Sequence, residues 1–303
     1  MTLSTSKTLR AIRKWYLGFA FLFVIIICWK NFPETKDLTH HLSKLPTSVF
    51  IMSLSLAIGS YLFRSLRWFR YMRLKEYKAS LSKHTLIYFS GFSFTASPGK
   101  VGELMRATHL SQLGIPFKFT FFSFLSERLL DVIAVACLGS YFLATHFNDS
   151  FFILPAGLLL ACFTAYPFLA WVNGLKTHLP IEELKSQWSP LTLSKNLPLS
   201  FLAWLLQGVV LYALLISLGV EINLMTAISI YCLSLLIGAA SLIPSGIGVT
   251  EIGMVWLLTQ IQVDGDIALI ASIVTRGLTL WPAMIIGLVS AITLQRASKF
   301  GAK

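Results

Sequence analysis

The chain has 303 residues, of which 55% are hydrophobic and 13% charged, whereas a soluble domain carries roughly a quarter charged residues. Its apolar residues form uncharged runs long enough to cross a bilayer as helices, and its net charge of +12 comes from basic residues beside those runs. These features exclude an ordinary soluble enzyme, argue against a nucleic-acid partner, and predict an all-α integral membrane protein with a single polytopic domain over residues 1–303.

The first apolar run extends from Trp15 to Trp29 and follows several basic residues. That order is also typical of a signal peptide, but the Lys30–Pro33 stretch lacks the small-residue pattern of a cleavage site. We therefore interpret the run as a retained membrane helix. Together with the run from Pro46 to Phe63, it predicts N-terminal helices within residues 12–63.

A basic stretch over residues 64–83 follows the second run, and aromatic residues are interleaved with its lysines and arginines. Such a mixture beside a membrane helix is typical of the bilayer surface, where basic side chains contact anionic lipids. We predict a lipid-interface role for five residues of this stretch: Arg64, Arg67, Trp68, Arg70 and Arg73.

Two later segments, residues 84–146 and 225–294, share an order of features that predicts an internal repeat. Each has an apolar half, a Pro/Gly break that ends in a glutamate, a short helix, and a long apolar helix with an arginine. The breaks are Pro98–Glu103 and Pro244–Glu251, and the glutamate precedes the arginine by 25 residues in both copies. The apolar half before the first break is about 20 Å long as a helix, too short to span a bilayer. We predict a broken, re-entrant helix pair in each copy; two Pro-kinked hairpins of full spans are the alternative.

The distribution of lysine and arginine predicts the orientation. Basic residues crowd the N-terminus, the stretch 64–83, the loop around Lys185 and the C-terminal tail, whereas the connectors around Asn148, Asn223 and Gly265 have none. Because basic loops stay on the cytoplasmic side, we predict a multi-pass protein of an inner or plasma membrane with both termini cytoplasmic. The two copies are then entered from opposite sides and are inverted, an arrangement typical of transporters.

Charged residues inside apolar segments are costly in a bilayer unless they are paired or hydrated, so each is a functional candidate. Arg128 and Arg276 are candidates for holding an anionic headgroup, with Glu103 and Glu251 as counter-charges or proton carriers. Asp131, three residues after Arg128, is interpreted as its structural ion-pair partner. The glycines of the breaks either expose backbone N–H groups to an anion or only permit tight turns. The further substrate-binding candidates are Lys100, Arg106, Gly99, Gly102, Gly246 and Gly248.

In their order, these motifs resemble the transmembrane, flippase-like domain of the lysylphosphatidylglycerol synthase family. The likeness covers roughly residues 9–295 and depends on Arg67-Trp68, both Pro/Gly breaks, Glu127-Arg128 with Asp131, and Arg276. It implies a helical bundle with two re-entrant elements and a role in moving lipids between leaflets. The second break reads Pro-Ser-Gly where the family usually has Pro-Gly-Gly, and we do not expect the aminoacyl-transferring domain of other members in this chain.

We favour a lipid translocator that moves an anionic phospholipid or a phosphate-linked glycolipid between leaflets. The alternatives are a non-catalytic membrane scaffold for a lipid-modifying or glycosyl-transferring enzyme, and an integral lipid transferase. We expect no enzyme activity, metal or cofactor, because the histidines are scattered and the four cysteines fall within apolar runs without metal spacing. Membrane lipids are the expected partners, with a membrane enzyme as a further partner in the scaffold alternative; the sequence gives neither the lipid nor the oligomeric state.

Overall fold

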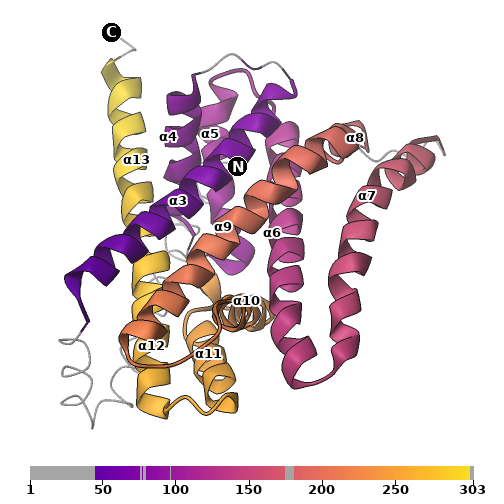
Figure 1. Cartoon of the computed structure of the whole chain (residues 1–303). Coiled ribbons are helices and arrows are strands. Elements are labelled where there is room, and N and C mark those ends of the chain that lie inside the picture. Colours follow the sequence, from indigo (N-terminus) through magenta and orange to yellow (C-terminus); the bar gives the residue numbers. More distant parts are fainter. Residues whose placement is uncertain (1–44, 76, 78–79, 96, 175–180, 301–303) are drawn as a thin grey trace.

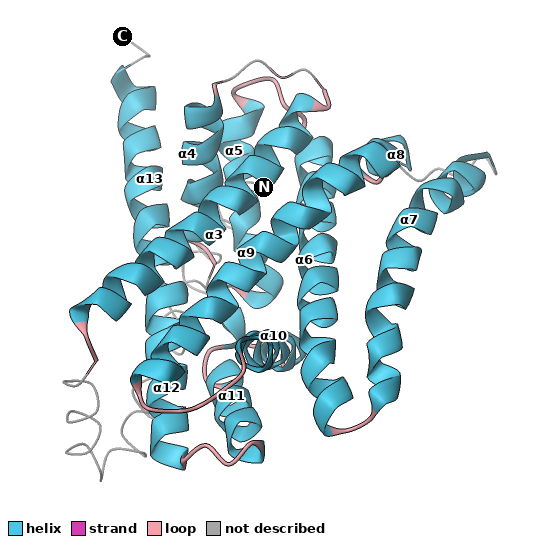
Figure 2. Ribbon diagram, viewed as in Figure 1, coloured by secondary structure: helices cyan, strands magenta, loops and turns pink. Residues whose placement is uncertain are grey.

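The computed structural model describes residues 45–300 except 76, 78–79, 96 and 175–180 (Figure 1). The predicted membrane helix from Trp15 to Trp29 lies outside the described residues. The described part of the chain is helical and contains no strand (Figure 2), which confirms the predicted all-α class. Four of its helical segments are long and apolar enough to cross a membrane: Thr47–Arg73, Asp149–Trp171, Pro190–Ser217 and Gly265–Ala297.

The chain forms α-helices and short 3₁₀ helices, labelled η. In chain order they are α3 (Thr47–Arg73), α4 (Leu81–Phe92), η2 (Pro98–Met105), α5 (Arg106–Ser111), α6 (Phe117–His146), η3 (Asp149–Phe152), α7 (Ile153–Gly174), α8 (Ile181–Gln187), α9 (Pro190–Ser217), α10 (Leu224–Ala240), η4 (Pro244–Gly246), α11 (Val249–Gln260), α12 (Gly265–Thr279) and α13 (Trp281–Phe300). Helix α3 packs along α9, α10 packs against α6 and α11, and α13 packs against α4. A Cβ on Gly287 of α13 would lie 2.3 Å from the backbone nitrogen of Ser93, so the absence of a side chain lets α13 meet the end of α4.

Both predicted breaks interrupt helices. After α4 the chain continues as η2 and α5, and after α10 it continues as η4 and α11. Pro98 and Pro244 each begin a 3₁₀ helix, a position that suits a residue without a backbone N–H. Helices α4 and α5 lie in the upper half of the molecule in Figure 1, and α11 and α12 lie in the lower half.

The long helix predicted to carry the second arginine is divided. Helix α12 ends at Thr279 and α13 begins at Trp281, with Pro282 directly after the junction. Leu280 between them keeps a helical backbone and donates to the Arg276 backbone oxygen at 2.9 Å, so α12 and α13 follow each other as one spanning segment, Gly265–Ala297. Pro282 has no N–H to donate, which accounts for the interruption at Leu280.

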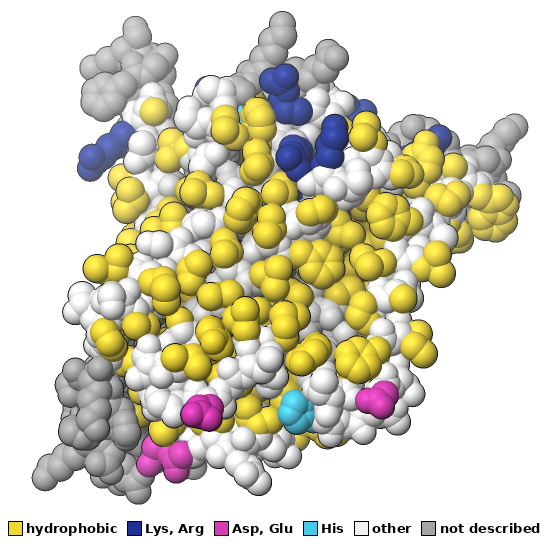
Figure 3. All heavy atoms as spheres, in the orientation of Figure 1, with side chains coloured by type: hydrophobic (Ala, Val, Ile, Leu, Met, Phe, Trp, Pro, Cys, Tyr) yellow, Lys and Arg dark blue, Asp and Glu magenta, His cyan; other side chains and the backbone are white. Residues whose placement is uncertain are grey.

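The molecular surface separates by residue type. The face in Figure 3 carries hydrophobic side chains across its middle, with Lys and Arg along one edge and Asp and Glu along the opposite edge. The exposed acids of the described residues include Asp149, Glu221 and Asp266, whereas the exposed bases include Arg73 and Lys83. An apolar band bounded by polar edges is the surface that a bilayer requires.

The predicted interfacial stretch needs a correction. Helix α3 continues through it to Arg73, and its arginine-rich half lies inside the bundle. Arg64 is 5% exposed, and Arg67 and Trp68 are fully buried, so these three residues do not form a lipid surface. Arg70 is half-buried and Arg73 is exposed, so only this end of the helix keeps the predicted position. The physical reason is that the Trp204 ring of α9 lies against Arg64, and two carboxylates of α6 pair with Arg67.

Candidate functional site

The two breaks meet inside the molecule. The 3₁₀ helices η2 and η4 are in contact, and the Ser245 hydroxyl donates a hydrogen bond of 2.8 Å to the backbone oxygen of Thr95. Segments 150 positions apart in the chain are joined by this bond. This contact therefore places the two Pro/Gly breaks of the predicted repeat side by side.

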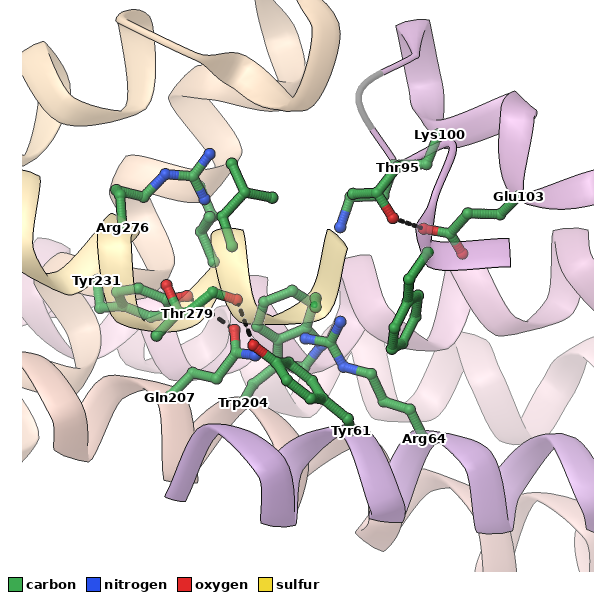
Figure 4. A pocket seen from close by; sticks show the side chains of 14 residues that line it. Tyr61, Arg64, Thr95, Lys100, Glu103, Trp204, Gln207, Tyr231, Arg276 and Thr279 are labelled. Carbon is green, nitrogen blue, oxygen red and sulfur yellow. Dashed lines mark hydrogen bonds between the residues drawn. The ribbon is translucent and has the colours of Figure 1, made fainter. Parts of the chain in front are cut away.

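A pocket lies beside this contact (Figure 4). Side chains from the first break, α3, α9, α10, α12 and the start of α13 surround it. Its polar and aromatic lining residues are Tyr61, Arg64, Thr95, Lys100, Glu103, Trp204, Gln207, Tyr231, Arg276 and Thr279. Lys100, Glu103 and Arg276 were predicted from the sequence, whereas the contributions of α9 and α10 were not.

Arg64 was predicted at the lipid interface and lies in the pocket lining instead. Its guanidinium lies over the ring of Trp204, 4.1 Å from the ring centroid, and the Lys100 ammonium lies 6.0 Å from the same ring. The Nε and Nη2 atoms of Arg64 are buried and have no hydrogen-bond partner among the described residues. Neither cation forms an ion pair with a carboxylate of the described residues.

Arg276 is held by its own repeat. Its Nε donates to Glu251 at 2.9 Å and its Nη2 donates to the backbone oxygen of Ser245 at 2.7 Å. The other oxygen of Glu251 accepts from the Gly248 N–H at 2.6 Å, at the start of α11. This confirms Glu251 as the contact expected for Arg276, and the pair fixes the second break onto α12 while Arg276 still lines the pocket.

The corresponding pair of the first repeat differs. Arg128 lies 3.7 Å from Glu103, 3.6 Å from Glu127 and 3.4 Å from Asp131, distances too long for hydrogen bonds. Three carboxylates thus surround this guanidinium, and Arg128 is not among the pocket-lining residues. Arg128 lies beside Glu103 and Asp131, as expected. Arg128 and Arg276 do not line the same pocket.

A buried ion network lies next to the pocket and connects α3, α5 and α6. Arg67 contacts Glu127 at 3.1 Å and Asp131 at 2.8 Å, and Arg106 contacts Glu127 at 2.7 Å. Arg67 also donates to Ser200 of α9, and Tyr88 donates to Glu127 at 2.7 Å. Asp131 is therefore shared between Arg67 and Arg128 rather than paired with Arg128 alone. Arg106, predicted to bind substrate, is buried over the ring of Trp68 and serves this network.

The glycines of the breaks meet steric requirements. Gly246 and Gly248 have positive φ angles of 62° and 87°, which favour glycine. A Cβ on Gly102 would lie 2.6 Å from the backbone oxygen of Phe94, and one on Gly246 would lie 2.5 Å from the Thr250 hydroxyl oxygen. Gly99 lies in η2. Tight turning and close approach account for Gly102, Gly246 and Gly248 without a ligand.

Together, the spanning helices, the apolar surface band and the charged pocket inside the bundle define a polytopic α-helical membrane protein. The chain belongs to the family of the lysylphosphatidylglycerol synthase TM region, whose family model matches residues 6–287. One segment is similar to a UPF0104 membrane protein of Methanothermobacter thermautotrophicus (strain Delta H), with 26% identity over 106 residues, 33% of this chain and 31% of that protein. A second similarity, to a protein with the same description from that organism, has 33% identity over 89 residues, 29% of this chain and 27% of that protein. The matched segments thus span less than a third of each relative's length.

Proposed function

We propose that this protein is a lipid translocator, which moves an anionic phospholipid or a phosphate-linked glycolipid between leaflets without a chemical reaction. The observation that carries the proposal is the pair of cations, Arg64 and Lys100, that line a pocket inside an apolar bundle and form no ion pair with a described carboxylate. A charge inside the bilayer is costly unless a counter-charge or water compensates it. A negatively charged headgroup would supply the counter-charge, and guanidinium groups match phosphate oxygens well.

We further propose that the two repeats are inverted and that each break is re-entrant. Three observations support this arrangement: the Glu–Arg pair 25 residues apart forms a contact in both copies, the two breaks touch, and the short helices after them lie in opposite halves of the molecule. Nitroxide labels at Ser97 and Ser245, measured by power-saturation EPR in nanodiscs, should both report depths near the bilayer midplane. A surface depth at either position would contradict the re-entrant arrangement.

The orientation follows as a proposal from the charge pattern. We infer that both termini and the loop around Lys185 are cytoplasmic, because basic loops stay on that side. The opposite basic and acidic edges of the surface in Figure 3 support this orientation. Single cysteines at Asn148, Asn223 and Gly265, in a background without the native cysteines, should react with an impermeant reagent added outside intact cells. Labelling of Lys185→Cys from outside would overturn the orientation.

The translocation proposal is tested with purified protein in liposomes. A fluorescent anionic lipid should become accessible in both leaflets, and Arg64→Gln should slow this exchange at least tenfold because the pocket loses a headgroup contact. Arg73→Gln is the matched control, since Arg73 lies on the same helix but is exposed. A scaffold would show no exchange without its partner enzyme, and a transferase would yield a modified lipid; either result would refute the proposal.

A further inference from the structure

The buried charges of the described residues do not balance. Inside the bundle and around the pocket lie six cations and four carboxylates: Arg64, Arg67, Lys100, Arg106, Arg128 and Arg276 against Glu103, Glu127, Asp131 and Glu251. The excess is two positive charges. Other acids lie at the surface, namely Asp149, Glu221, Asp264 and Asp266, and Glu183 forms a partly exposed pair with Lys75.

The excess has a location. Four of the six cations each lie within ion-pair distance of at least one carboxylate: Arg67, Arg106, Arg128 and Arg276. Arg64 and Lys100 have no such contact with a carboxylate that the structure describes. These two cations both line the pocket, and both lie over the ring of Trp204. The buried Nε–H and Nη2–H₂ donors of Arg64 have no hydrogen-bond partner among the described residues, so the excess positive charge of that part of the chain lies at this pocket.

Few of the described side chains that line the pocket can act as acceptors. Glu103 is the carboxylate among them: one of its oxygens accepts from Thr95 at 3.0 Å, and the other lies 3.7 Å from Arg128. The Gln207 side-chain oxygen accepts from the Tyr231 hydroxyl at 2.8 Å, so the group that Gln207 has left to offer is its amide N–H₂. An occupant rich in acceptor oxygens, with two negative charges, would complement this donor set.

We infer that the pocket selects a headgroup with a doubly charged phosphate, either a phosphomonoester or a diphosphate, over a singly charged phosphodiester. A phosphomonoester carries close to two charges at pH 7 and has three acceptor oxygens, whereas a phosphodiester carries one charge. Both kinds of lipid are anionic, so the proposed function does not distinguish them. The inference deepens that function, and it uses the same pocket.

Binding of two lipids with identical chains tests the inference. Dioctanoyl phosphatidic acid, a monoester, should bind the purified full chain about tenfold more tightly than dioctanoyl phosphatidylglycerol, a diester, at pH 7.5. Because the second phosphate pKa is about 6, this preference should largely disappear at pH 5, while binding of the diester should change little. Isothermal titration calorimetry at both pH values measures this with the unmodified protein. Equal affinities at pH 7.5, or a preference that does not depend on pH, would overturn the inference.

Variants assign the preference to the pocket. Arg64→Gln or Lys100→Met each removes one of the two excess charges and should reduce the monoester preference to threefold or less, whereas Arg73→Gln should preserve it. A preference that survives both pocket variants would refute the assignment. Competition with glycerol 3-phosphate distinguishes a lipid ligand from a water-soluble phosphate. If glycerol 3-phosphate displaces bound phosphatidic acid at a concentration similar to that of the lipid itself, the pocket selects the phosphate charge and does not require the lipid chains. Equal rates of exchange of the two lipids in liposomes would support the proposed translocation and refute the selectivity inferred here.

Discussion

The contact between Arg276 and Glu251 permits a prediction that separates folding from ligand binding. Arg276→Gln removes a charge-assisted hydrogen bond to Glu251 and a second bond to the Ser245 backbone oxygen, which together hold the second break. Each hydrogen bond to a charged group contributes about 1.5–3 kcal/mol. Glu251 would be left partly buried without its partner, so we expect a loss of roughly 3–5 kcal/mol.

The double variant Arg276→Gln with Glu251→Gln removes both charges. A glutamine at position 251 keeps an acceptor oxygen for the Gly248 N–H, so most of the lost stability should return. Thermal unfolding in detergent measures the difference: at about 2 °C per kcal/mol for a large domain, the single variant should melt roughly 5–10 °C lower, and the double variant should melt within a few degrees of the parent protein.

Lipid exchange then decides what Arg276 does in the folded protein. If Arg276 contacts the headgroup, the double variant folds but stays slow, and Arg276→Lys is only partly active because an ammonium lacks the planar fork of donors. Full exchange by the double variant would reduce Arg276 to a structural charge and refute its role in the pocket. An unchanged melting temperature for Arg276→Gln would refute the structural part of the reasoning instead.

Two further predictions concern stability. Gly246→Ala should destabilise the protein by about 1–3 kcal/mol, because Gly246 has a φ of 62° and a Cβ would lie 2.5 Å from the Thr250 hydroxyl oxygen. Gly157→Ala in α7 is the control and should be neutral or slightly stabilising, because a Cβ there meets nothing within 4 Å. Equal melting temperatures of the two variants would contradict the steric argument. Glu127→Gln should lower the free energy of unfolding by roughly 3–5 kcal/mol, because it leaves two buried arginines short of a counter-charge. Glu183→Gln, which affects a partly exposed pair, should lower it by about 0–1 kcal/mol. Similar losses for the two variants in denaturant unfolding would refute the stabilising role of the network.

Local signals in the sequence were sufficient to predict the second break. Proline, glycines and a glutamate before a new helix specify a turn wherever they occur, and an arginine in an apolar helix requires a partner from elsewhere. The equal spacing in both copies identified Glu251 for Arg276, and the structure forms that contact. Equal spacing did not predict an equal environment. Asp131 and Glu127 lie beside Arg128, so Arg128 joins a larger network and does not line the pocket, whereas Glu103 and Arg276 do.

The position of Arg64 could not be predicted from local sequence. Basic residues interleaved with aromatic rings are typical of a bilayer surface, and the same composition suits a buried network in which rings and carboxylates surround guanidinium groups. The choice between them depends on residues far along the chain, Trp204 of α9 for Arg64 and Asp131 of α6 for Arg67. A signal was present in the spacing, because Arg64 and Arg67 are separated by three positions and share one face of a helix that continues past them.

This correction also bears on the orientation argument. Arg64 and Arg67 are buried inside the bundle, so they cannot be counted as loop charges that hold the following segment in the cytoplasm. Exposed bases remain at this end of α3 and at the start of α4, namely Arg73, Lys75 and Lys83. The asymmetry against the acidic connectors therefore persists with the two arginines removed. The burial of Arg64 also supports the proposed pocket. A cation that does not reach water at the membrane surface needs a counter-charge, either from another part of the bundle or from a bound ligand.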